Sequence, residues 1–421
     1  MNVDLKQQLY EMGEQAKKAS SILNTSSSVQ KNSFFDFAIL EIKTSSSFIL
    51  EANAQEIAQA QKNGKDDAFI DRLTLNRERL AAMCATLKEI KLFDEPVGKV
   101  LANWDRPNGL NISRVSTPLG VIGLIFESRP NVACDAGALC LKSGNAVILR
   151  SGKDGLKSAS AIVDALRKAL IKANLPENSI QIVPSESREA ATLMLEGLNS
   201  AIDVIVPRGG KSLVAEVKRS AKVPVFGHLE GICHVYVDQH ANQVKALAIC
   251  INAKMRRTGI CGAAETILVH QGIADEFGLQ LICELKSLDC EIRGCDNIRA
   301  LDASIIPAIE DDWSTEYLAP IISIKVVSDV REAVDHINQY STGHTESIVS
   351  ENKETQEVFT SSIDSAILMI NASTQFADGG EFGLGGEIGI ATGKFHARGP
   401  VGIDQLTSFK YIVSGNGQIR D

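Results

Sequence analysis

The regular alternation of apolar and mixed segments after Gly120 constrains the fold of this chain most. Each apolar run is short and uninterrupted, which is typical of strands buried on both faces of a sheet. The apolar runs are GVIGLIFE (120–127), AVILR (146–150), IQIV (180–183), AIDVIV (201–206) and VPVF (223–226), and the helix-like stretches between them are 131–142, 157–173, 188–198 and 211–222. This alternation predicts an open, largely parallel sheet with helices on both faces. Ligands of such sheets bind at the carboxyl ends of the strands.

A second α/β segment starts near Gly231, with the strand-like run ICHVYV and a helix-like stretch at 242–256. It ends around Gly393, after a glycine-dense loop. Residues 4–92 predict helices, and the Ser-rich break at 24–28 offers N-cap residues for one of them. The dipeptide Asn108-Gly109 predicts a hairpin turn, which either pairs with another subunit or is a plain surface hairpin.

The composition sets the class of protein. With 421 residues the chain is too long for one core, so we expect two or three domains. A net charge of −9 argues against nucleic acid as the main partner. The first residues carry no apolar signal sequence, and no apolar run reaches the ~18 residues of a membrane span. Nine cysteines and seven histidines are scattered without zinc-site spacing, so we expect a reduced, cytoplasmic protein without a metal site.

One cysteine stands out among the nine. The segment NAKMRRTGICGAAETILVH (252–270) places Cys261 between two nearby glycines, after the cations Lys254, Arg256 and Arg257. A thiol attacks as its thiolate, a form that nearby cations favour, and small neighbours leave room for a carbonyl group. The segment is compatible with a catalytic nucleophile. The alternative is a small buried hydrophobe, as most free cysteines are.

Two groups of residues are candidates for binding phosphate. Gly209-Gly210 opens a helix, whose free N–H groups could bind a phosphate oxygen. It is not a Walker loop, because Ile205 stands where that motif needs glycine. Arg150 and Lys153 follow a buried strand and suit the phosphates of a nucleotide, including a 2′-phosphate. The plainer alternatives are a turn and ordinary solvated charges.

These segments occur in an order that resembles the aldehyde dehydrogenase superfamily, and most closely its γ-glutamyl phosphate reductases. The segments that carry the resemblance are PLGVIGLIFESRPNVACDAGALCLKSGNAVILRSGKD (118–154), VPRGGKSLV (206–214), VPVFGHLEGICHVYVD (223–238), the cysteine loop, TEYLAPIISIKVV (315–327) and the tail GGEFGLGGEIGIATGKFHARGPVGIDQLTSFKY. The resemblance implies two doubly wound α/β domains. It places an NADP-binding domain at 1–104 and 119–229, a catalytic domain at 230–394, and a hairpin with a C-terminal strand for oligomerisation at 105–118 and 395–421.

The resemblance also implies roles for individual residues. Cys261 is the expected nucleophile, and Asn131 the expected donor to the developing oxyanion, together with the backbone N–H of Cys261. Glu316 would hold the nicotinamide ribose of NADP(H). The other residues expected at the cofactor are Arg150, Ser151, Lys153, Gly209 and Gly210, and those expected at the phosphate or α-carboxylate of the substrate are Arg129, Lys254, Arg256 and Arg257.

One departure from the family pattern bears on the reaction. Hydrolytic aldehyde dehydrogenases carry a glutamate base where this chain has His228, and Glu230 is displaced by two positions. That base activates the water that cleaves the thioester. Its loss fits an enzyme that exchanges a thioester with a phosphate.

The expected reaction is therefore the NADPH-dependent reduction of L-glutamyl 5-phosphate to L-glutamate 5-semialdehyde, in proline biosynthesis. The alternatives are an NAD(P)-dependent dehydrogenase that uses another acyl donor, such as a CoA thioester, and a catalytically silent binding subunit. We also expect a homo-oligomer, either a dimer or a tetramer. An association with glutamate 5-kinase is a further expectation.

Overall fold

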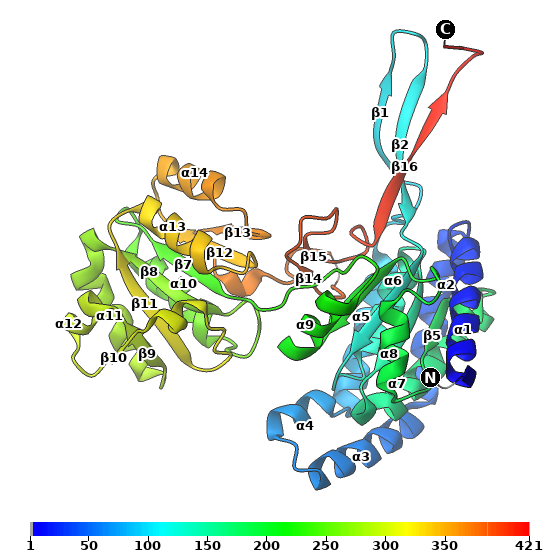
Figure 1. Ribbon diagram of the computed structural model, residues 1–421, viewed down its shortest axis with the longest axis horizontal. Coiled ribbons are helices and arrows are strands. Elements are labelled where there is room, and N and C mark those ends of the chain that lie inside the picture. The colour runs from blue at the N-terminus through cyan, green and yellow to red at the C-terminus, as the bar shows by residue number, and fades with distance from the viewer. Residues whose placement is uncertain (1–2, 385, 421) are drawn as a thin grey trace. The chain divides into compact units, whose positions relative to one another are not determined.

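The computed structural model describes residues 3–384 and 386–420, which form two compact units (Figure 1). The first unit comprises residues up to Gly227, the segment Gly383–Gly389 and the chain from Phe395 onward. The second unit comprises His228–Phe382 and Ile390–Lys394.

The first unit opens with helices over the region where the sequence predicts them, and the structure has five. They are α1 (Val3–Leu23), α2 (Ser28–Thr44), α3 (Ser46–Lys62), α4 (Asp67–Leu73) and α5 (Arg77–Leu92). The Ser-rich break ends in a capping box, in which the Ser27 hydroxyl accepts from the Gln30 N–H and the Gln30 side chain accepts from the Ser27 N–H. Both groups satisfy backbone donors that the first turn of a helix leaves unpaired, so α2 begins where the serines predict.

The sheet of the first unit is parallel and has the strand order β5-β4-β3-β6. Its strands are β3 (Val121–Phe126), β4 (Ala146–Ser151), β5 (Ile180–Ile182) and β6 (Val204–Arg208), and the helices between and after them are α6 (Val132–Lys142), α7 (Leu156–Lys172), α8 (Arg188–Leu195) and α9 (Lys211–Ser220). All six residues of β3 are buried, which explains the continuous apolar run. Strands are added to one side of β3 as far as β5, and β6 is then added to the other side, next to β3. Open α/β sheets bind their ligands where the strand order changes in this way.

The prediction of a strand at 223–226 is wrong. That segment forms only an isolated bridge between Val225 and Ile205, with the Pro224 carbonyl accepting from the Ile205 N–H over 2.8 Å. Pro224 has no N–H of its own to donate, so a regular ladder cannot extend through it.

A three-stranded antiparallel sheet extends from the first unit (Figure 1). The predicted hairpin is present as β1 (Val100–Asp105) and β2 (Asn111–Pro118), and the C-terminal strand β16 (Thr407–Ser414) pairs with β2. At the turn the Arg106 N–H donates to the Leu110 carbonyl over 2.7 Å, and Gly109 has a φ of 83°. Such a φ is accessible to glycine at little cost, which explains the Asn-Gly signal.

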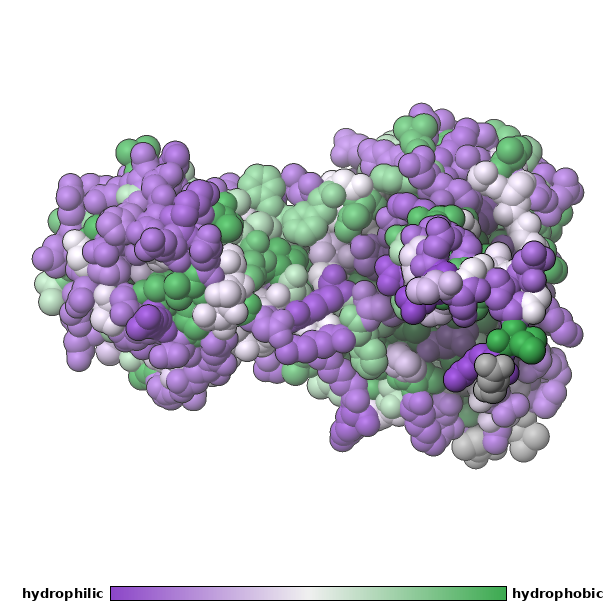
Figure 2. Space-filling view, turned by 90° about the horizontal axis from the view of Figure 1, so that it is seen from above, coloured by the Kyte–Doolittle hydropathy of each residue, from purple (hydrophilic) through white to green (hydrophobic). Residues whose placement is uncertain are grey.

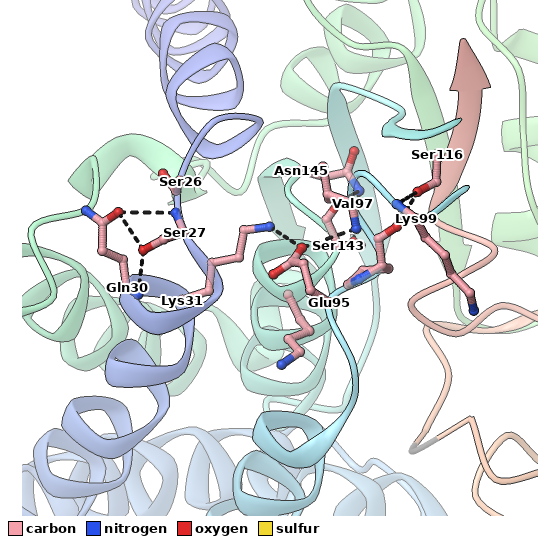
Figure 3. Close-up of polar contacts among 12 residues, drawn as sticks. Ser26, Ser27, Gln30, Lys31, Glu95, Val97, Lys99, Ser116, Ser143 and Asn145 are labelled. Atoms are coloured by element: carbon pink, nitrogen blue, oxygen red, sulfur yellow. Dashed lines mark hydrogen bonds and ion pairs between the residues drawn. The ribbon is translucent and has the colours of Figure 1, made fainter. Parts of the chain in front are cut away.

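The hairpin is anchored at its base by a buried lysine (Figure 3). The Lys31 ammonium of α2 lies 2.7 Å from the Glu95 carboxylate, and Lys31 is 1% exposed. Glu95 also accepts from the Val97 N–H over 3.2 Å, and the Lys99 N–H donates to the Ser116 hydroxyl over 2.9 Å. Residues 95–99 are thereby held between α2 and the last residues of β2.

The second unit contains a seven-stranded sheet in which every pairing is parallel. The strand order is β10-β9-β11-β8-β7-β12-β13. The strands are β7 (Cys233–Val237), β8 (Ala264–His270), β9 (Glu291–Gly294), β10 (Ile306–Pro307), β11 (Ile321–Val327), β12 (Thr345–Val349) and β13 (Ile367–Ile370), and the helices are α10 (Gln243–Met255), α11 (Ala274–Ser287), α12 (Asp296–Leu301), α13 (Val330–Tyr340) and α14 (Lys353–Ser362). The short strand β14 (Ile390–Ala391) also belongs to the second unit, and the next strand along the chain, β15 (Gly399–Pro400), belongs to the first.

Both units contain a parallel sheet connected by helices, which confirms the α/β fold class that the alternation predicts. On the face that Figure 2 displays, the surface is mostly hydrophilic with small apolar groups between. Among the described helices, none combines the length and the apolar character needed to cross a bilayer.

Candidate active site

The cysteine loop lies at the amino edge of the second unit's sheet. Because the strands are parallel, the residues that precede each strand gather at the same edge. Cys261 lies three residues before β8, Gly231 two residues before β7, and His344 directly before β12. Segments separated by more than a hundred residues in sequence therefore meet around one thiol.

The backbone of Gly231 packs against Cys261 so closely that only glycine fits. A Cβ atom at residue 231 would lie 2.7 Å from the carbonyl carbon of Cys261 and 2.8 Å from its Cα, distances that real Cβ atoms essentially never show. The Cys233 thiol donates to the Cys261 carbonyl oxygen over 3.1 Å. The Gly231 N–H donates to the Glu316 carboxylate over 2.8 Å. The loop of the candidate nucleophile and the predicted ribose-binding glutamate are thus held by one glycine.

Two histidines lie beside this thiol. The His228 Nδ1 is 2.8 Å from the Ile390 carbonyl oxygen, and the His228 ring meets the His344 ring edge to face, with centroids 4.8 Å apart. His344 is fully buried, and its burial, together with the nearby His228, lowers its pKa to about 3. The sequence does not predict His344 at this site, because no spacing rule connects residues that precede three separate strands.

The three cations before Cys261 lie in different environments. Lys254 is fully buried and its ammonium forms an ion pair with the buried carboxylate of Glu265. Burial raises the pKa of Glu265 to about 7, although the adjacent ammonium opposes this shift. Arg256 and Arg257 are exposed. The charge of Lys254, which the sequence predicts at the substrate, is therefore already paired inside the fold. Arg256 also donates to the side-chain oxygen of the buried Gln375 over 3.4 Å.

The remaining predicted residues lie in the first unit, at the carboxyl edge of its sheet. Asn131 lies just before α6, and its side-chain amide donates to the Asp135 carboxylate over 2.9 Å. Burial raises the pKa of Asp135 to about 6. Arg129 is exposed. A side-chain amide carries two N–H hydrogens, so Asn131 keeps a second donor besides the one that Asp135 accepts.

The glycine turn after β6 is open at Gly210. Gly210 is the N-cap of α9, and no heavy atom lies within 4 Å of the place where its Cβ would be. Its N–H donates to the Glu127 carboxylate over 3.3 Å. At Gly209 a Cβ would lie 2.6 Å from that same carboxylate and 2.7 Å from Cδ2 of Leu213, so both side chains would have to shift to admit a larger residue. The turn is open on one side and lined by backbone at a helix N-terminus.

The basic residues after β4 lie at the same edge. Arg150 is half-buried, donates to the Glu186 carbonyl over 3.3 Å, and keeps a buried Nε without a partner among the described residues. Its pKa is lowered, chiefly by burial. Ser151 is buried and Lys153 is exposed. An orphaned guanidinium nitrogen at the sheet edge that also carries the glycine turn fits the binding of an anionic ligand.

Comparisons with known proteins show the family to which the chain belongs. Residues 14–294 and 307–412 match the model of the aldehyde dehydrogenase family. The γ-glutamyl phosphate reductase of Brucella suis is 56% identical over 420 residues, which is 100% of both chains, and that of Parvibaculum lavamentivorans is 53% identical over 97% of each chain. The crystal structure of the γ-glutamyl phosphate reductase from Thermotoga maritima superposes with a TM-score of 0.96 at 42% identity, covering 98% of this chain and 100% of that chain. The chain therefore belongs to the aldehyde dehydrogenase family, and within it to the γ-glutamyl phosphate reductases.

Proposed function

We propose that this protein catalyses the NADPH-dependent reduction of L-glutamyl 5-phosphate to L-glutamate 5-semialdehyde and phosphate, a step of proline biosynthesis. The observation that carries the proposal is Cys261 on a tight loop beside Gly231, in a chain whose full-length relatives at 53–56% identity are named γ-glutamyl phosphate reductases. In the proposed first step the Cys261 thiolate attacks the acyl carbon, the bond from carbon to phosphate oxygen breaks, and phosphate leaves with the electron pair.

His228 is suited to accept the thiol proton. The Ile390 carbonyl can only accept a hydrogen bond, so Nδ1 of His228 carries the ring proton and the lone pair lies on Nε2. His344 remains neutral because burial lowers its pKa to about 3. A histidine at residue 228 can thus take a proton from the thiol, and no glutamate occupies the position of the hydrolytic base.

Asn131 and the backbone N–H of Cys261 are proposed to stabilise the oxyanion that forms when the thioester is reduced. The Asp135 carboxylate fixes the Asn131 amide by accepting one of its hydrogens over 2.9 Å. This hydrogen bond also fixes the direction of the second N–H of the Asn131 amide. Donors that are already oriented before the reaction stabilise a developing charge most effectively. Collapse of the thiohemiacetal would release the aldehyde and regenerate the Cys261 thiolate.

The residues present fit a dinucleotide cofactor. The open turn at Gly209 and Gly210 would bind the pyrophosphate, provided that Glu127 releases the Gly210 N–H. The orphaned Nε of Arg150, with the exposed ammonium of Lys153, favours a 2′-phosphate and hence NADP(H) over NAD(H). Glu316, beside the cysteine loop, is proposed to accept from the nicotinamide ribose. When bound, the cofactor supplies the hydride that reduces the thioester.

Three arginines are proposed to bind the anionic groups of the substrate. Arg129, Arg256 and Arg257 are exposed. The substrate carries a phosphate and an α-carboxylate, both of which suit the guanidinium fork. We leave Lys254 out of this set, because its charge is already paired with Glu265 inside the core.

The protein is further proposed to form a dimer or tetramer through the β1-β2-β16 sheet. This sheet exposes large apolar side chains along its strands, namely Val100, Leu101, Trp104, Phe409, Tyr411, Ile412 and Val413. Exposed apolar strands with open edges are typical of surfaces that pair with another chain. All nine cysteines are free thiols, as expected of a reducing compartment such as the cytoplasm.

The test is a spectrophotometric assay of NADP reduction by glutamate semialdehyde, with and without inorganic phosphate. The wild-type protein should require phosphate and gain no rate from CoA. Cys261→Ala should still bind NADP(H) but lose the phosphate-dependent rate. A rate with CoA alone would instead support a CoA-acylating dehydrogenase, and retained turnover in Cys261→Ala would contradict the role of this thiol.

A further inference from the structure

The candidate nucleophile is surrounded by a set of soft metal ligands. One ligand atom from each of His228, Cys261 and His344 lies within 4.8 Å of the corresponding atoms of the other two. The three residues come from the segments before β7, β8 and β12, so the parallel sheet assembles them at its amino edge. Nothing in the proposed reduction requires two imidazoles at this position.

His344 has an unsatisfied nitrogen. Its side chain is fully buried, and its Nε2 has no hydrogen-bond partner among the described residues. Its Nδ1 lies 2.8 Å from the Thr345 hydroxyl and 3.6 Å from the Cys233 thiol. Leaving a buried polar nitrogen without a hydrogen-bond partner is unfavourable, so this nitrogen is suited to bind a ligand. Metals bind the neutral form of the imidazole ring.

His228 is held in the orientation of a metal-binding histidine. Its Nδ1 donates to the Ile390 carbonyl over 2.8 Å, which leaves the lone pair on Nε2. Metal-ligating histidines almost always donate their other ring N–H to a carbonyl, a carboxylate or water. The hydrogen bond therefore fixes both the tautomer and the direction of the ring.

We propose that His228, Cys261 and His344 form a Zn²⁺ site, and that zinc bound there reversibly inhibits the enzyme. A site made of one thiolate and two imidazoles binds Zn²⁺ in preference to Mg²⁺ or Ca²⁺, which favour oxygen ligands. In tetrahedral zinc sites the ligand atoms are ~3.5 Å apart. Since the three ligand atoms lie within 4.8 Å of one another, they need to approach by up to about 1.3 Å. On binding, the Cys261 thiol releases its proton to solvent and its sulfur becomes a metal ligand. No oxidation or reduction takes place, and the fourth position remains open to water or a substrate oxygen.

Inhibition follows because a sulfur lone pair given to zinc is no longer available for attack on the acyl carbon. This second half of the proposal rests on the role of Cys261 proposed above, whereas metal binding itself does not. Metal binding and inhibition can therefore be disproved independently. Metal binding is measured first, and enzyme activity is measured second.

The binding test uses the full-length, metal-free protein titrated with Co²⁺, whose bond to a thiolate absorbs in the near ultraviolet, followed by displacement with Zn²⁺. The wild-type protein should show the thiolate band at one equivalent of metal, and Cys261→Ser should lose it. His228→Gln and His344→Gln should each weaken Zn²⁺ binding at least ~10-fold. Cys283→Ser removes an exposed thiol on α11 that is not part of the set, and should bind as the wild type does.

Two outcomes would overturn the metal site. One is the absence of a thiolate band from the wild-type protein. The other is a Zn²⁺ affinity unchanged in both histidine variants, which would indicate an adventitious thiol contact. His228→Gln keeps the test decisive if the buried His344→Gln fails to fold. If binding is as expected, stoichiometric Zn²⁺ should abolish turnover and a chelator should restore it. Full activity of the zinc-loaded protein would overturn the inhibition while leaving the metal site intact.

Discussion

The side-chain amide of Asn131 donates to the carboxylate of Asp135 over 2.9 Å, across the first turn of α6. This bond orients the proposed oxyanion donor, so we expect Asn131→Ala to lower kcat about 100-fold. Asp135→Ala should lower kcat about 10-fold, because the amide then rotates, and Asp135→Asn should recover most of the rate by again accepting the hydrogen bond. Steady-state kinetics should show the change in kcat with an unaltered KM for NADP. A kcat equal to that of the wild-type protein in all three variants would show that Asn131 does not take part in the mechanism.

The pH dependence of stability should carry the signature of Asp135. Burial raises its pKa from 3.8 to about 6, so the folded state favours the protonated carboxyl group. This contribution to stability is complete below about pH 4 and is lost as the pH rises through about 6. The free energy of unfolding of the wild-type protein, relative to Asp135→Asn, should fall by about 1–3 kcal/mol between about pH 4 and pH 7. Urea titrations of both proteins at several pH values measure the difference, and parallel curves would contradict the assignment.

Gly231→Ala should damage the cysteine loop selectively. The added methyl group would overlap the backbone of Cys261, and accommodating such overpacking typically costs about 1–3 kcal/mol. We expect kcat/KM to fall at least ~10-fold, since displacements of about 1 Å at a reacting group have effects of this size or larger. Gly259→Ala is the matched control in the same loop, because its nearest heavy atom is the Leu318 carbonyl oxygen at 4.0 Å. Similar activity of the two variants would show that the contact between Gly231 and Cys261 is unimportant.

The ion pair between Lys31 and Glu95 should be required for stability rather than for catalysis. The Lys31 side chain is 1% exposed and that of Glu95 is 24% exposed, so removing one partner leaves a poorly solvated charge. Lys31→Met should lower the free energy of unfolding by about 2–4 kcal/mol. The double variant Lys31→Met with Glu95→Met should recover much of this loss, because both charges are then absent. Denaturant titrations around this cycle give the coupling energy, and additive effects would show that the pair is not coupled.

The parts of this fold that follow from local chemistry could be predicted from sequence. The buried run at 121–126, the serine cap of α2 and the Asn-Gly turn each depend on residues close together in the chain. The prediction of a strand at 223–226 is wrong because Pro224 interrupts the ladder. The proline is a local signal against a strand, but the prediction gave more weight to the apolar run. His344 and the buried environment of Lys254 could not be predicted, because each depends on which strands become neighbours in the sheet.

The parallel sheet of the second unit also sets the electric field around the cysteine loop. Helices that connect parallel strands run back along the sheet, so they end at the amino edge with their partially negative carboxyl ends. α10 ends at Met255, shortly before Cys261, and α13 ends at Tyr340, shortly before His344. Each such end is equivalent to roughly half a negative charge and attracts cations. Lys254, Arg256 and Arg257 therefore complement the dipole of α10 whether or not they touch substrate. An acyl phosphate approaching this edge meets repulsion that arginines offset, whereas a metal cation or a protonated imidazole is attracted.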